Sequence, residues 1–135
     1  GPDEGDGAAV SDAIGGERRI SWIGALGPND VVDRLRKAAV YVLPAIDEPF
    51  PMTVLEAMSV GLPVVITTSC GLADFVTEHG AGLVVEATAA DIAGAIHELL
   101  GNPERAQAMA ARGRQAVRSY ASVDAVVSKL VTYYQ

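Results

Sequence analysis

Short apolar runs alternate with amphipathic stretches along most of this 135-residue sequence. Residues 29–39 repeat apolar positions at helical spacing, with acids early and a lysine late. Residues 51–60 form a second expected helix, which proline opens and Gly61 ends. A shorter helix is expected at residues 73–76. Four runs around these stretches have the length and composition of buried strands: RISWI at 19–23, VYVLP at 40–44, PVVIT at 63–67 and LVV at 83–85.

Three further helices are predicted to close the chain. Thr88 starts the first, and Asp91 three residues later makes a variant of the capping box. Asn102 followed by Pro103 combines a helix cap with proline at the first helical position, which is typical of a helix start. Ser122 is expected to cap the last helix.

Strands without charge that are separated by helices predict one parallel sheet covered on both faces. This is the doubly wound, Rossmann-like α/β class. The length fits a single domain with a substantial core. The first seven residues, GPDEGDG, contain no initiator methionine and no signal-peptide layout, so we interpret the chain as starting within a longer protein.

Composition excludes several classes of protein. Half of the residues are hydrophobic and 20% are charged, which is a soluble globular balance, and no apolar run is long enough to cross a bilayer. The net charge of −7 argues against a nucleic-acid partner. The single cysteine, Cys70, rules out an intrachain disulfide and fits a reducing compartment, so a cytoplasmic location is expected. Arg112, Arg114 and Arg118 are interpreted as a solvated helix face, with an acidic membrane surface or another domain as the alternative.

The most promising site lies in residues 44–56. In doubly wound sheets, ligands bind outside the carboxyl ends of the strands, and the loop after the strand at 40–44 occupies that place. Free backbone amides near Met52 and Thr53, at the start of the next helix, form an anion site. Glu48 lies just before this helix and Glu56 lies within it, where a carboxylate among apolar neighbours needs a partner. Two carboxylates and an anion site together favour a ligand with hydroxyls and phosphate, such as a nucleotide sugar.

The segment EPFPMTVLEAMSVGLPVV resembles the E-x7-E signature of retaining glycosyltransferases with the GT-B fold, in the large family 4, also called group 1. The likeness continues through GLVV at residues 82–85, the helix at 89–100 and the NPER motif that follows. It implies that residues 1–135 are the C-terminal, donor-binding domain of such an enzyme. By the same likeness, this domain is truncated at its N-terminus and the acceptor-binding N-terminal domain is absent.

The resemblance also implies roles for individual residues. Glu48 would bind hydroxyls of the donor sugar, and Glu56 would bind the ribose hydroxyls of the nucleotide. Backbone amides around Phe50, Met52 and Thr53 would hold the distal phosphate. The donor would be a UDP-, GDP- or ADP-sugar, with no metal and no cofactor. Enzymes of this type lack a clear side-chain nucleophile, and none is assigned.

Two departures from the family pattern change the expectation. Pro51 stands where the family usually has glycine, so one phosphate contact should be lost while the helix start stays intact. The arginine and lysine residues that grip the diphosphate in the family would precede this sequence. The isolated chain is therefore expected to be inactive. It is also expected to self-associate, because a sheet without its first strands has an unpaired edge and an uncovered apolar face. Any peripheral membrane contact would be made through the absent domain.

Simpler interpretations stay open at this stage. Glu48 is also explained by the helix dipole, and Glu56 by pairing inside the core. Asp47 is interpreted as a solvated loop acid, Cys70 as a small residue near the site, and His79 and His97 as isolated residues without metal-ligand spacing. For the whole chain, the alternatives to a glycosyltransferase are a non-catalytic Rossmann-like interaction module and a sugar-nucleotide epimerase.

Overall fold

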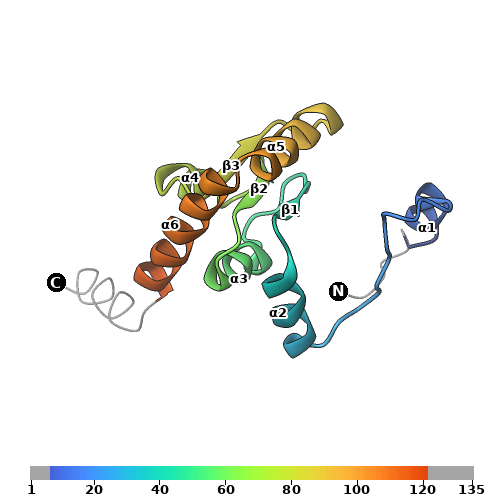
Figure 1. Ribbon diagram of the computed structural model, residues 1–135, viewed down its shortest axis with the longest axis horizontal. Coiled ribbons are helices and arrows are strands. Elements are labelled where there is room, and N and C mark those ends of the chain that lie inside the picture. Colours follow the sequence, from blue (N-terminus) through green and yellow to red (C-terminus); the bar gives the residue numbers. More distant parts are fainter. Residues whose placement is uncertain (1–6, 122–135) are drawn as a thin grey trace.

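A computed structural model describes residues 7–121 of the chain. From β1 onward every strand is followed by a helix, which is the connection that parallel strands require. The elements, shown in Figure 1, are α1 Gly7–Ile14, α2 Pro28–Lys37, β1 Tyr41–Leu43, α3 Met52–Val60, β2 Val64–Thr67, α4 Ala73–Glu78, β3 Gly82–Val85, α5 Ala89–Gly101 and α6 Pro103–Ala121.

The three strands form one parallel sheet in the order β1-β2-β3. Tyr41 of β1 pairs with Val64 of β2, which in turn pairs with Gly82 of β3. The central strand β2 is fully buried, because it has a neighbour on each side and helices above and below. Since the strands are parallel, their carboxyl ends all meet at one edge of the sheet.

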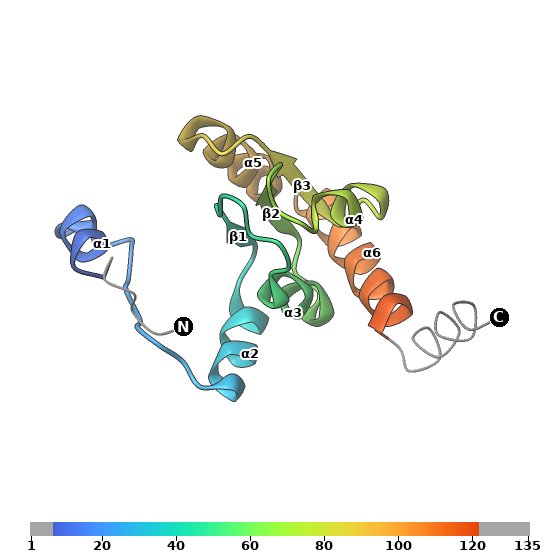
Figure 2. The same cartoon turned by 180° about the vertical axis from the view of Figure 1, so that it is seen from behind.

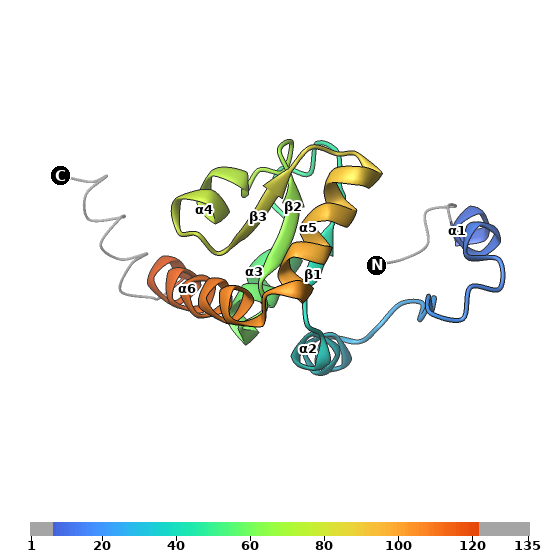
Figure 3. The same ribbon diagram turned by 45° about the horizontal axis from the view of Figure 1, so that its top comes forward.

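Helices cover both faces of the sheet. Val64 and Ile66 of β2 lie in the larger core, together with residues of α3, α4 and α6. Val65 points the other way and packs with Ala95 and Leu99 of α5. Figure 3 shows α5 and α3 on opposite sides of the strands. The predicted parallel α/β sheet with helices on both faces is therefore confirmed.

The helix ends follow the signals in the sequence. Gly61 ends α3 in the left-handed conformation, with φ of 84°, where glycine has no steric cost. At the start of α5, the hydroxyl oxygen of Thr88 accepts a hydrogen bond of 3.1 Å from the N–H of Asp91. At the start of α6, the side-chain oxygen of Asn102 accepts one of the same length from the N–H of Arg105. These caps confirm the predicted starts of both helices.

The predicted strand at residues 19–23 is wrong. The N–H and the guanidinium of Arg19 donate to the Glu17 carboxylate at 2.8–3.0 Å, which holds residues 17–20 in a turn. This local bonding competes with pairing to a strand. The segment lies apart from the sheet, on the path from α1 to α2 (Figure 1), and its apolar side chains Ile20, Trp22 and Ile23 stay about half exposed.

The helix α1 was not predicted. Val10, Ala13 and Ile14 have helical spacing and were the available signal, but none of the residues of α1 is buried. In Figures 1 and 2, α1 lies apart from the sheet and its covering helices. The helix predicted to begin at Ser122 falls outside the described residues.

Candidate functional site

The candidate site lies at the edge of the sheet where the strands end. We call residues 44–51, between β1 and α3, the first loop, and residues 68–72, between β2 and α4, the second loop. Glu48 and Phe50 lie in the first loop, and Met52, Thr53 and Glu56 lie on α3. The fold therefore places Glu48, Phe50, Met52 and Thr53 at the carboxyl edge of the sheet, where ligands of doubly wound proteins bind, and Glu56 one turn further along α3.

The start of α3 is open toward solvent. Pro51 is the residue just before the helix, and its carbonyl accepts a hydrogen bond of 3.1 Å from the N–H of Val54. Within residues 7–121, the N–H groups of Met52 and Thr53 have no backbone acceptor. Two amides at a helix N-terminus are thus free to bind an anion. The expectation that proline leaves the helix start intact is correct, although Pro51 lies one residue earlier than the first helical position.

Glu48 and Glu56 are both half-buried. Among residues 7–121, neither side-chain carboxylate takes part in an ion pair or accepts a hydrogen bond. The sequence suggested that Glu56 needs a protein partner because burial looked likely. The structure instead leaves its carboxylate partly in water, where no partner is required. Both carboxylates are therefore available to hydroxyl groups of a ligand.

Tyr41 also belongs to the site, although the sequence indicated only that it lies in a strand. Its hydroxyl donates a hydrogen bond of 2.7 Å to the hydroxyl oxygen of Thr53. Burial raises the pKa of Tyr41, the bond to Thr53 opposes this, and the nearby Glu56, Cys70 and Glu48 raise the pKa further. The Tyr41 hydroxyl therefore lies among the predicted site residues. The signal for it was the polar tip of the one aromatic residue in an otherwise apolar strand.

The second loop contributes residues that the sequence did not indicate. The N–H of Gly71 donates to the Glu48 carbonyl at 2.8 Å, and the hydroxyl oxygen of Ser69 accepts from the N–H of Asp47 at 3.3 Å. Asp47 is exposed, as expected of a solvated loop acid, but it adopts a left-handed backbone with φ of 56°. The second loop thus fastens the part of the first loop that holds Glu48.

Comparison with known proteins identifies the family. A family model described as "Glycosyl transferases group 1" matches residues 9–116. The chain belongs to the group 1 glycosyl transferases. This match confirms the family resemblance carried by the segment around Glu48 and Glu56.

Three relatives illustrate the range of this glycosyltransferase family. The chain is 32% identical over 126 residues to a GDP-mannose-dependent monoacylated alpha-(1-6)-phosphatidylinositol monomannoside mannosyltransferase of Corynebacterium glutamicum, covering 87% of this chain and 33% of that protein. It is 29% identical over 127 residues to a D-inositol 3-phosphate glycosyltransferase of Corynebacterium urealyticum, covering 93% and 30%. A glycogen synthase of Mycobacterium tuberculosis is 32% identical over 105 residues, covering 76% and 25%.

A solved structure agrees with these relatives. Sucrose-phosphate synthase from Thermosynechococcus elongatus superposes on this glycosyltransferase chain with a TM-score of 0.79 and 27% sequence identity, over 94% of this chain and 32% of that chain. That neighbour has the GT-B fold, as the resemblance implied. The chain spans about a third or less of the length of the relatives and of the structure that it matches.

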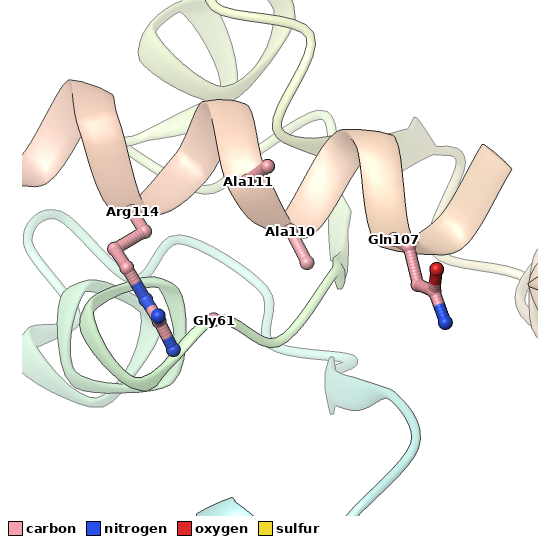
Figure 4. A pocket seen from close by; sticks show the side chains of 5 residues that line it. All are labelled: Gly61, Gln107, Ala110, Ala111 and Arg114. Carbon is pink, nitrogen blue, oxygen red and sulfur yellow. The ribbon is translucent and has the colours of Figure 1, made fainter. Parts of the chain in front are cut away.

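The cavity in Figure 4 lies at the other end of α3. It has a volume of about 340 Å³, and Arg114 reaches into it from α6 past Gly61, the residue that ends α3. A larger cavity of about 420 Å³ lies beside α2 and contains neither Glu48 nor Glu56. We place the candidate site by topology and not by cavity size, because both cavities lie away from the carboxyl edge of the sheet. The remaining residues that line the cavity in Figure 4 are Gln107, Ala110 and Ala111.

Other candidate chemistry in the described residues has a simple explanation. Cys70 is a free thiol buried in the larger core. His79 packs its ring against Phe75, with centroids 4.5 Å apart, and bonds its Nδ1 to the Phe75 carbonyl, whereas His97 is exposed on α5. Between residues 7 and 121, no group of three His, Cys, Asp or Glu side chains is arranged to hold a metal ion. No helix in that range is long and apolar enough to cross a membrane.

Proposed function

We propose that this chain is the donor-binding half of a retaining glycosyltransferase, which transfers a sugar from a nucleotide-sugar donor to an acceptor. The observation that carries the proposal is the arrangement of Glu48 and Glu56 around the open start of α3, with neither carboxylate paired in the described part of the chain. Donor sugars present hydroxyls, and nucleotide diphosphates present phosphate oxygens. The site offers acceptors for the first and N–H donors for the second.

Each residue then has a role in donor binding. Glu48 accepts hydrogen bonds from hydroxyls of the transferred sugar, and Glu56 accepts them from the ribose. The amides of Met52 and Thr53, together with that of Phe50, hold the distal phosphate. As the bond to the sugar breaks, negative charge grows on the diphosphate, and amides that are already in place stabilise this charge without reorganising.

Pro51 limits the number of phosphate contacts. Proline has no N–H, so the position just before α3 offers no donor to the phosphate. The helix itself is unaffected, since a helix start needs no hydrogen bond from that residue. Phosphate binding at this site therefore depends on the Met52 and Thr53 amides and on groups supplied from elsewhere in the enzyme.

The identity of the donor is the next question. The mannosyltransferase relative from Corynebacterium glutamicum is GDP-mannose-dependent by name. GDP-mannose is accordingly the first donor to test for this protein, followed by UDP- and ADP-sugars. The acceptor binds in the part of the enzyme outside this chain, which also provides any peripheral membrane contact. We place the enzyme in the cytoplasm and expect the isolated chain to be inactive.

The test compares two carboxamide variants in the complete enzyme. Glu56→Gln should weaken nucleotide diphosphate binding at least about tenfold, since each bond between a hydroxyl and a charged acceptor contributes roughly 1.5–3 kcal/mol. Glu48→Gln should lower turnover more than nucleotide affinity, because its partner is the transferred sugar. Calorimetric titration with GDP, UDP and ADP gives the affinities, and product analysis by NMR shows whether the anomeric configuration is retained.

Asp47→Asn is the matched control for these variants. It removes an exposed carboxylate from the same loop, and asparagine accepts the left-handed backbone that this position has. Its binding and turnover should equal those of the parent. If both glutamate variants also behave like the parent, the carboxylates are structural and the proposal is wrong. A complete protein with no affinity for any nucleotide diphosphate would instead be an interaction module that kept the fold.

A further inference from the structure

The second loop fastens the first loop through side chains and backbone groups that are more than 20 residues apart in the chain. The Ser69 hydroxyl accepts a hydrogen bond from the N–H of Asp47 at 3.3 Å and donates one to the Ala45 carbonyl at 3.4 Å. The hydroxyl of Thr67, at the end of β2, also donates to the Ala45 carbonyl. The first loop is thereby tied to the central strand of the sheet.

Gly71 brings the two loops into backbone contact. Its N–H donates to the Glu48 carbonyl at 2.8 Å. A Cβ atom at position 71 would lie 1.8 Å from the carbonyl oxygen of Pro49 and 2.7 Å from its carbonyl carbon. Both atoms belong to the backbone, so no side-chain rotation relieves the clash. Only glycine allows the second loop to approach the backbone of Glu48 and Pro49 this closely.

Asp47, just before Glu48, has an unusual backbone conformation and is hydrogen-bonded to the second loop. Asp47 is the one non-glycine residue with positive φ among residues 7–121. Aspartate adopts this left-handed conformation more readily than most other residues with a side chain. Here the hydrogen bond to Ser69 fixes the Asp47 amide, and the next residue is Glu48, whose carbonyl is fixed by Gly71. The second loop thus holds the peptide group that precedes Asp47 and the peptide group that follows Glu48.

We infer that Gly71 and Ser69 are positioning residues for Glu48, which set where its carboxylate lies relative to the start of α3. This inference rests on the proposed function, in which Glu48 binds the donor sugar. Among residues 7–121 no group holds the Glu48 carboxylate itself, so the contact that the protein makes to this residue is through its backbone carbonyl. Sugar positioning therefore depends on the loop after β2, whereas nucleotide binding depends on α3.

Steady-state kinetics of the complete enzyme tests this division. Gly71→Ala should lower kcat roughly tenfold to a hundredfold, because small misplacements of a positioning group have effects of that size. Its KM for the nucleotide sugar should change by a smaller factor than kcat, since Glu56 and the Met52 and Thr53 amides are untouched and only the Phe50 amide belongs to the displaced Pro49 peptide group. Gly94→Ala is the matched control, because a Cβ on that exposed residue of α5 meets no atom within 4 Å. Its kinetics should equal those of the parent.

A double variant distinguishes positioning from a general structural role. If Gly71 acts through Glu48, then Gly71→Ala combined with Glu48→Gln should be no slower than Glu48→Gln alone. Losses that multiply would overturn the inference, as would a Gly71→Ala enzyme with parental kcat. Ser69→Ala should show a smaller kcat loss, which Ser69→Thr restores by keeping the hydroxyl. This serine pair decides the question if Gly71→Ala fails to fold.

Amide NMR of the complete enzyme gives a readout without ligand. Gly71→Ala should shift the amide signals of residues 45–48 and of Phe50, and leave those of β3 and α5 in place. Shifts spread evenly over the chain, or absent from the first loop, would contradict the fastening described above. A parent enzyme without turnover or nucleotide affinity would overturn the proposed function, while the NMR result would still report on the contact between the loops.

Discussion

At the scale of single residues, Tyr41 shows how a strand residue enters a site. It starts β1 with a side chain that packs against the larger core, yet its hydroxyl reaches Thr53 on the following helix. An aromatic ring with a polar tip suits a position that is apolar at one end and wet at the other. Glu48 and Glu56 lie near that tip, so the proton of Tyr41 is held in a partly buried and acidic environment.

The environment of Tyr41 predicts a pH dependence of stability. Burial, together with the nearby carboxylates, raises the pKa of Tyr41 above its ordinary value of 10.0. The folded protein therefore binds the Tyr41 proton more tightly than the unfolded chain, and this stabilises the fold. The stabilisation is complete below the unfolded-state pKa of Tyr41 and is lost as the pH rises through its folded-state pKa. Between about pH 9 and pH 11, the unfolding free energy of the parent should therefore fall more steeply than that of Tyr41→Phe.

Denaturant unfolding at a series of pH values measures this difference. Tyr120→Phe, which keeps the ring that packs on Phe75 with centroids 5.2 Å apart, gives the comparison for removing a phenol elsewhere in the chain. Identical profiles for the parent and Tyr41→Phe would show that Tyr41 titrates normally in the folded protein.

Single residues were predictable where the signal was local. Glu48 and Glu56 stand out because the spacing between them and their place around one helix start can be read along the chain. Gly71 could not be found in this way, because its importance comes from the backbone of Pro49, 22 residues earlier, and is set only when β1 and β2 pair. Contacts between loops depend on the register of the strands beneath them.

At the scale of elements, α6 holds the ends of two other helices. The guanidinium of Arg114 donates to the Val60 carbonyl at 2.5 Å, in the last turn of α3, and that of Arg112 donates to the Gly80 carbonyl at 2.9 Å, just after α4. Interpreting both arginines simply as a solvated face was therefore incomplete. A cation near the carbonyls of a helix C-terminus is also favoured by the helix dipole.

Removing Arg114 should lower stability, and removing Arg118 should not. Arg114→Ala loses an exposed hydrogen bond from a charged donor at a helix end, which predicts a loss of about 0.5–1.5 kcal/mol. That corresponds to a fall in Tm of roughly 2–10 °C for a chain of this size. Within residues 7–121, Arg118 forms no ion pair or hydrogen bond, so Arg118→Ala serves as the control. Equal melting temperatures for both variants would contradict the capping role of Arg114.

Elements were predictable where burial and helix caps agreed. β1, β2, β3 and the helices α2 to α6 were all predicted, with ends that differ by a few residues, because each has an apolar face that the fold buries. Residues 19–23 have the composition of a strand but form a turn and an extended segment. Arg19 bonds to Glu17, two residues earlier, and this local contact takes the place of pairing with another strand. A β-strand needs a neighbouring strand to pair with as well as a suitable sequence of apolar residues. That sequence does not indicate whether a neighbouring strand is present.

At the scale of the whole molecule, apolar surface is left uncovered. Ile20, Trp22 and Ile23 are 54%, 55% and 48% exposed along one extended segment. On the sheet, β1 pairs only with β2 among the described strands, so its outer edge presents backbone groups without a strand partner. An unpaired strand edge and clustered exposed apolar side chains both favour association with another chain.

The isolated chain should therefore self-associate. Burying apolar surface is favourable by about 25 cal/mol per Å² of area, and two copies can each supply an apolar segment and a strand edge to the other. Light scattering across a dilution series should give an apparent mass above the 14.0 kDa of one chain, rising with concentration. Replacing Ile20 and Trp22 by serine should reduce this mass. Leu100→Ser, which changes an exposed apolar residue of α5, should not. A mass of 14.0 kDa at every concentration would mean that neither the segment nor the edge of β1 is available to a second copy.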